Sequence, residues 1–148
     1  MILSIAQIIL EEARFGHVGN FLAQPPTEVA APSPVELRVE LLKAPDGKSA
    51  VVRLRAGSGA SEVPYSFSIS YLVIFGMEEQ EGVPTPADLD HRLLITGGTM
   101  AFPFVRECVA NLTSRGRFGP SWLAPTDFNQ IALPVTSAAQ AQTESPRS

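Results

Sequence analysis

The chain has 148 residues, 45% of them hydrophobic, and this size and apolar content predict one globular domain with a single core. A net charge of −4, from 11 basic and 15 acidic residues, argues against nucleic acid as the main partner, because phosphate binding needs clustered Lys and Arg. One cysteine excludes an internal disulfide, and one Cys with two His is too few for a structural zinc site, so no metal and no cofactor are expected.

The first ten residues, MILSIAQIIL, are apolar but too short to cross a bilayer. They lack the basic residues that begin a signal peptide, and Glu11 and Glu12 come directly after them. We therefore expect this segment to be part of the mature fold and the protein to be cytoplasmic. Ile5, Gln7 and Ile9 would share one face of a strand, which is the first of the four expected strands.

Strands are expected in the first half of the chain. A proline-rich stretch at 23–34 predicts an extended connection, and strict apolar alternation over 35–42 is typical of a half-buried strand. The Asp46-Gly47 pair predicts a hairpin, and alternation over 51–56 predicts its return strand. Consecutive hairpins favour an antiparallel meander.

The last expected strand lies in VPYSFSISYLVIFGM, residues 63–77. Serines alternate there with large apolar residues, which predicts one polar face and one apolar face. The apolar side chains either form the core or line a groove for extended peptide, and the sequence leaves both alternatives open. The same two alternatives hold for the other aromatic residues nearby, and the set is Tyr65, Phe67, Ile69, Tyr71, Phe102, Phe104 and Trp122.

The main helix is expected from Met100 to Arg115, with Pro103 in its first turn and Gly116 as its C-terminal stop. Residues 88–95 predict only a turn or two of helix, ended by the TGG segment at 96–98. An i, i+3, i+4, i+7 spacing marks one apolar face of the main helix, made of Val105, Cys108, Val109 and Leu112.

A short second helix is expected from Thr126 or Asp127 until Pro134 ends it. The fold class is therefore α+β, a four-stranded antiparallel sheet with one long and one short helix packed on one face. Residues 1–134 form the domain, and the small, polar segment 135–148 is expected to be a disordered tail.

The sequence offers no positive case for an enzyme. Cys108 lies on the apolar face of the helix, where a thiol is ordinarily a small buried hydrophobe. His17 and His91 have no neighbours at metal-ligand spacing. A thiol enzyme that uses Cys108 is the alternative from another class, and we expect no catalytic residue.

The stretch FPFVRECVANLTSRGRFGPSWLAPTDF resembles the signature of the SecB family of export chaperones, and the resemblance covers residues 3–133. The signature runs from Phe-Pro-aromatic through Arg-Glu and Ser-Arg-Gly-x-Phe to Leu-Ala-Pro and a last Phe. His91 also stands where many members have a histidine. The matching residues are Phe102, Pro103, Phe104, Arg106, Glu107, Ser114, Arg115, Gly116, Phe118, Leu123, Ala124, Pro125 and Phe128.

The resemblance implies a homotetramer, a dimer of dimers whose long helices pack across the interface. It implies that unfolded polypeptides are held without ATP and delivered to the SecA motor, with no nucleic acid and no direct membrane insertion. The peptide-binding residues would be Tyr65, Phe67, Ile69, Tyr71, Phe104 and Trp122. The oligomer interface would use Val105, Cys108, Val109 and Leu112, although the sequence does not say which helix face meets the chain's own sheet.

Export members of this family contact the motor through acidic residues on the first and last strands. Glu12 keeps one such position, whereas Gly16 and Ser68 stand where carboxylates are expected. Two chaperone roles therefore stay open. One is export, and the other is dedication to a single partner, such as the antitoxin of a toxin–antitoxin system.

Overall fold

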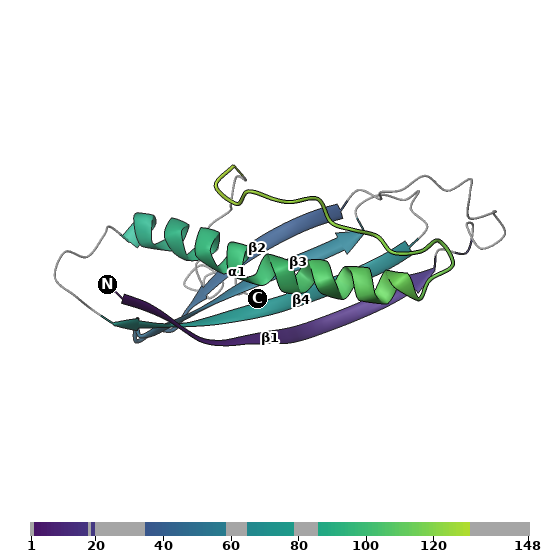
Figure 1. Ribbon diagram of the computed structural model, residues 1–148. Helices are drawn as coiled ribbons and strands as arrows, with labels where there is room; N and C mark the ends of the chain where they lie inside the picture. The colour runs from purple at the N-terminus through teal and green to yellow at the C-terminus, as the bar shows by residue number, and fades with distance from the viewer. Residues whose placement is uncertain (1, 18, 20–34, 59–64, 79–85, 131–148) are drawn as a thin grey trace, which may run out of the picture.

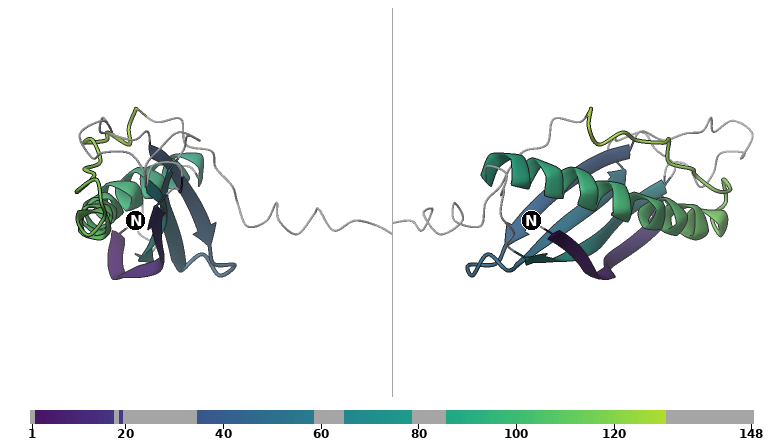
Figure 2. Two further views of the ribbon diagram at one scale, coloured as in Figure 1. Left: turned by 90° about the vertical axis from the view of Figure 1, so that its right-hand side faces the viewer. Right: turned by 60° about the vertical axis from the view of Figure 1, so that its left-hand side comes forward.

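The computed structural model describes residues 2–17, 19, 35–58, 65–78 and 86–130 (Figure 1). One antiparallel sheet in the order β1-β4-β3-β2 carries a helix, α1, on one face (Figure 2). This arrangement confirms the α+β class and the consecutive hairpins. The elements are β1 (Ile2–His17), β2 (Val35–Lys43), β3 (Ser49–Ser58), β4 (Tyr65–Glu78) and α1 (Pro86–Ser114).

The β2–β3 hairpin has the two faces that its alternation predicts. Val39 lies opposite Leu54 and Leu41 opposite Val52, and all four side chains are buried toward α1. At the turn, Gly47 adopts a φ of 69°, a conformation that favours glycine. One face of the hairpin therefore belongs to the core, and the other carries most of its charged residues.

β4 lies between β1 and β3 and supplies much of the core. Its odd-numbered residues face α1, and Ile69, Val73 and Phe75 are almost fully buried there. β1 is an edge strand whose register shifts between Ile5 and Gln7 and between Leu10 and Glu12. Such bulges bend a strand, and β1 curves along the side of the molecule (Figure 2).

α1 is one continuous helix, so the expected break at TGG and the expected start at Met100 were both wrong. Gly97 and Gly98 are buried where α1 meets its neighbours. A Cβ on Gly97 would lie 2.5 Å from the Cβ of Val52, and one on Gly98 would lie 2.7 Å from the Phe128 ring. These glycines therefore allow close packing, which outweighs their low helix propensity of about 1 kcal/mol relative to Ala.

Pro103 lies deep inside α1 and not in its first turn, which corrects the second expectation about this helix. Its side chain points outward and is exposed. A proline at such a position removes one helical hydrogen bond. Tertiary packing of the turns on both sides, through buried Ala101, Phe102 and Val105, holds the helix together across it.

The composition of α1 is explained by its contact with the sheet. By length and hydropathy, Ala87–Ser114 could cross a membrane, with a mean hydropathy of 1.2 over the most apolar window. Half of that window, however, is buried inside the molecule. Leu93, Leu94 and Val109 are among the fully buried residues, so packing on β2, β3 and β4 accounts for the apolar face.

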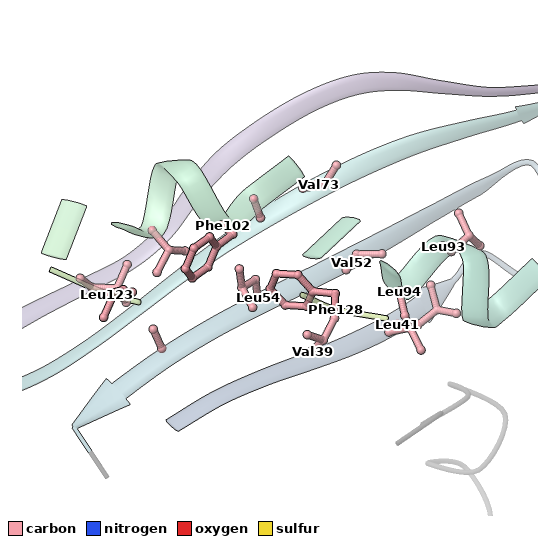
Figure 3. Close-up of a cluster of buried hydrophobic side chains, with 14 of the residues drawn as sticks. Val39, Leu41, Val52, Leu54, Val73, Leu93, Leu94, Phe102, Leu123 and Phe128 are labelled. Atoms are coloured by element: carbon pink, nitrogen blue, oxygen red, sulfur yellow. The ribbon is translucent and has the colours of Figure 1, made fainter. Parts of the chain in front are cut away.

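After α1 the chain returns along the helix as an extended strap, residues 115–130 (Figure 1). Thr113 fixes the start of the strap, because its buried Oγ1 accepts the N–H of Ser121 at 2.7 Å. Leu123 and Phe128 are buried, and the Phe128 ring lies beside Leu54 and Val39 (Figure 3). The strap therefore closes the open side of the core.

The described residues contain one helix, so the short second helix is not found in them. Residues 126–130 form a turn in which the Asp127 carbonyl accepts the N–H of Gln130 at 3.1 Å. Asp127 Oδ1 accepts the N–H of Asn129 at 3.0 Å, so Asp127 caps a turn and not a helix. The rest of that expected helix and the tail 135–148 lie outside the described residues.

Candidate functional site

The strap is anchored at its first turn by two ring side chains. Tyr65 Oη donates to the Gly119 carbonyl at 2.8 Å and accepts the Phe118 N–H at 2.7 Å. His17 Nε2 accepts the Arg117 N–H at 3.0 Å. These bonds tie residues 117–119 to the ends of β1 and β4.

The rings around this anchor form one aromatic cluster. Tyr65 contacts Phe15, His17 and Phe118 with ring centroids between 5.3 and 5.8 Å apart. Gly116 allows the backbone to pack directly against the Tyr65 ring, because a Cβ at this position would lie 2.6 Å from that ring. Burial raises the pKa of the Tyr65 hydroxyl above its ordinary value. This part of the signature is therefore structural, because it positions the remainder of the strap.

Beyond this anchor, α1 and Trp122 border a shallow groove with a volume of about 320 Å³. Trp122 is 58% exposed, and the Arg106 guanidinium lies 5.9 Å from the centre of its ring. Arg106 Nε is buried and has no hydrogen-bond partner among the described residues. The groove, which we call the Trp122 groove, is lined by Phe102, Pro103, Arg106, Glu107, Ala110, Asn111 and Trp122.

The Trp122 groove combines the features that suit an extended peptide of varied sequence. An exposed indole face and apolar walls accept apolar side chains without demanding one shape. The guanidinium of Arg106, which borders the groove beside Trp122, carries further N–H groups that can donate to a peptide carbonyl or carboxylate. The groove can therefore hold a polypeptide by many weak contacts.

A second apolar surface lies where α1 leaves β1 uncovered. Leu10 is paired with Tyr71 across the β1–β4 ladder, and the rings of Tyr71 and Phe104 lie 5.7 Å apart. Met100 precedes Phe104 by one helical turn and is also exposed. We call Leu10, Tyr71, Met100 and Phe104 the β1–α1 patch. Exposed apolar surface of this kind marks an interaction site.

The structure divides the expected peptide-binding residues into two groups. Phe104 and Trp122 are exposed and Tyr71 is half-buried, whereas Tyr65, Phe67 and Ile69 lie in the core beneath α1. A peptide cannot reach those three residues in this packing. The alternation of strand β4 predicted a shared face, but period alone does not reveal that a helix covers it.

The expected interface face of α1 turns toward the chain's own sheet. Val105 and Val109 are fully buried in the core, and the half-buried Cys108 and Leu112 pack against it. The two valines are therefore unavailable to a second copy. The exposed side of the helix carries Met100 and other residues that no periodicity rule singled out.

The thiol and the acidic residues show no activated chemistry. Burial, and then the charge of Glu107, raise the pKa of Cys108, which makes the thiol a poorer nucleophile. Glu12 is paired with Arg14 at 2.9 Å on the face of the sheet away from α1. Among the residues described, no group of three or more His, Cys, Asp or Glu is placed to hold a metal.

The fold and surface define a small α+β protein with an apolar groove beside its helix. The family model described as preprotein translocase subunit SecB matches residues 33–137. A protein-export protein SecB of Anaplasma phagocytophilum is 29% identical over 135 residues, which cover 86% of this chain and 85% of that protein. The chain belongs to the SecB family, which is a family of chaperones and not of enzymes.

Two further comparisons are narrower. A protein-export protein SecB of Wolbachia from Brugia malayi is 38% identical over 69 residues, 47% of this chain, and the match spans only 41% of that relative. The solved SecB-like chaperone of Mycobacterium tuberculosis, in complex with a ChAD peptide from the HigA1 antitoxin, has a TM-score of 0.67 at 20% identity. That comparison covers 84% of this chain and 90% of the solved one, and it shows a shared fold.

Proposed function

We propose that this chain is a cytoplasmic, ATP-independent chaperone that holds unfolded polypeptides in the Trp122 groove and delivers them for export. The observation that carries the proposal is the exposed Trp122 beside the Arg106 guanidinium, on a SecB-family fold. Unfolded chains offer apolar side chains and free carbonyls together. A groove with an indole face, apolar walls and an N–H donor binds both without reading a sequence.

Delivery to the SecA motor is the export form of this proposal, and dedication to one partner is the second candidate. The second is favoured by the shared fold with a chaperone solved in complex with an antitoxin peptide. The surface of the sheet also favours dedication to one partner, because it offers few carboxylates to the motor. Glu12 is already paired with Arg14, and Gly16 and Ser68 carry no carboxylate. Capture of many precursors from the native cell supports export, whereas capture of one small protein supports the second candidate.

We also propose that a second copy of the chain covers the β1–α1 patch in a homotetramer. The patch joins an edge strand to an uncovered face of the helix. A second molecule would pair with the strand edge and remove the apolar side chains from water. Leu10 is 46% exposed and Phe104 42% exposed, so the surface buries apolar area only when another molecule covers it.

Leu10→Lys is expected to convert the tetramer to smaller species, because it places an uncompensated charge in the buried interface. The Leu10 side chain is largely exposed in the single chain, so the fold itself should tolerate the change. Light scattering coupled to size exclusion measures the mass. Thr99→Lys, at an exposed position of α1, is the matched control. A Leu10→Lys protein that keeps the mass of the unmodified tetramer would rule out this interface.

Trp122 is the only tryptophan in the chain, so its fluorescence reports on the groove directly. Adding an unfolded, tryptophan-free polypeptide should shift the emission to shorter wavelength and protect the indole from acrylamide, because bound peptide excludes water. The native form of the same polypeptide is the control. Binding measured by anisotropy of a labelled client, with no change in Trp122 emission, would place the site elsewhere.

A further inference from the structure

The face of the sheet away from α1 carries two arginines that lie directly opposite each other. Arg38 of β2 is the cross-strand partner of Arg55 of β3. Like charges in this position repel and destabilise a sheet. The next pair on the same face, Glu40 and Arg53, has opposite charges. The unfavourable pairing of like charges is therefore confined to Arg38 and Arg55.

The carboxylates of Glu11 and Glu40 do not neutralise the charge of the two facing arginines. Arg53 is fully engaged, since its Nε and Nη2 donate to Glu11 at 2.8 and 3.0 Å and its Nη1 donates to Glu40 at 2.8 Å. These hydrogen bonds raise the pKa of Arg53 above its ordinary value. The carboxylates of Glu11 and Glu40 are thereby directed to Arg53 and not to the facing pair.

Arg38 and Arg55 have only weak contacts of their own. Arg38 Nη2 lies 4.0 Å from Glu36, and both side chains are mostly exposed there. An exposed ion pair at that distance contributes little to the stability of the fold. Arg55 Nε donates to Ser70 Oγ, a neutral acceptor, at 3.3 Å. Apart from the 4.0 Å ion pair of Arg38 with Glu36, neither guanidinium group is hydrogen-bonded to a carboxylate of the described residues.

The pair borders a small hollow that is open to a ligand. The hollow has a volume of about 130 Å³ and is lined by Glu36, Arg38, Arg55 and Gly57. Gly57 has no side chain on this surface, so the sheet backbone forms the floor beside the arginines. Two planar guanidinium groups above a flat floor can bind a carboxylate, which pairs with arginine through two parallel hydrogen bonds.

We propose that Arg38 and Arg55 form a docking site for an acidic, extended segment of a partner protein. The partner's carboxylates would supply the charge that the pair lacks. Glu36 in the wall disfavours a more highly charged phosphate group. The arginines lie on the face of the sheet away from α1, and the Trp122 groove is formed by α1, so a partner bound here leaves the groove free. Figure 2 shows α1 on one face of the sheet only. This inference does not depend on the proposed chaperone activity.

The test is the anisotropy of a labelled ten-residue peptide of alternating Glu and Ser, titrated with the full chain at low and at moderate salt. The chain should bind it, should lose affinity with added salt, and should not bind the same peptide with Gln for Glu. Arg38→Gln and Arg55→Gln should each weaken binding about tenfold or more, the scale of one charge-assisted pair. Glu36→Gln should tighten it.

Arg14→Gln is the matched control, because Arg14 lies on the same face, is highly exposed and has its own partner in Glu12. It should leave peptide affinity unchanged. Arg38→Gln should also melt no lower than the unmodified chain, since it relieves the repulsion. Absence of binding, equal loss with Arg14→Gln, or displacement by millimolar inorganic phosphate but not by acetate at equal ionic strength would overturn the proposal.

Discussion

Replacing Gly97 with Ala is expected to lower the free energy of unfolding by about 1–3 kcal/mol, the usual cost of overpacking a core. In an exposed helix the same change would be favourable by ~1 kcal/mol. Here the new Cβ would lie 2.5 Å from the Cβ of Val52. A Cβ is fixed to the backbone, so no change of rotamer relieves the contact and α1 must move away from β3.

Urea unfolding measures this effect, and a double-mutant cycle with Val52→Ala tests its cause. The two methyl carbons of Val52 would lie 2.6 and 2.7 Å from the new Cβ, so their removal should recover part of the loss. Asn111→Ala, at an exposed helix position, is the control for propensity alone. Gly97 would not be in a limiting contact with Val52 if Gly97→Ala behaved like Asn111→Ala, or if the two core changes were simply additive.

Gly98→Ala offers a graded comparison within the same helix. Its new Cβ would lie 2.7 Å from the ring of Phe128. That ring belongs to the strap and not to the sheet, so it can turn or shift more readily than a strand backbone. We therefore expect a smaller loss than for Gly97→Ala, although both glycines have the same intrinsic propensity.

The sheet could be predicted from the sequence because its information is local. Alternation over 35–42 and 51–56, with Asp46-Gly47 between them, already specifies two strands, their apolar faces and the turn. The structure agrees residue by residue. The position of β1 beside β4 could not be found this way, because pairing between distant segments leaves no mark in the period of either one.

The helix was predicted less well because its length depends on tertiary contacts. TGG reads as a break when only propensity is considered, and the packing of Gly97 against β3 is invisible in the sequence. The apolar face of Val105 and Val109 was found correctly, but periodicity alone does not say whether such a face meets the chain's own sheet or another molecule.

The signature that identifies the family serves mainly to build the strap. Phe102, Gly116, Phe118 and Phe128 hold the returning chain against α1 and the sheet. Arg106 and Trp122 are the residues that this construction presents outward. The unpartnered Arg106 Nε had no signal in the sequence, since only packing shows that an atom is buried and unsatisfied.

Replacing Trp122 with Ala is expected to raise the concentration of chaperone needed for half-maximal protection of an unfolded client by about tenfold or more. A buried aromatic anchor is typically worth about 2 kcal/mol when truncated. Trp122 is 58% exposed in the free chain, so its removal should change client binding far more than the stability of the fold. Cys108→Ser should leave client binding unchanged, because Cys108 packs against the core and does not line the Trp122 groove.

Light scattering from a chemically denatured client, diluted into buffer without ATP, measures whether the chain holds unfolded polypeptides. With four chains present per client molecule, scattering should stay near baseline, and Trp122→Ala should restore most of the aggregation at the same ratio. Unchanged aggregation in the presence of the folded chain would show that this protein does not hold unfolded polypeptides.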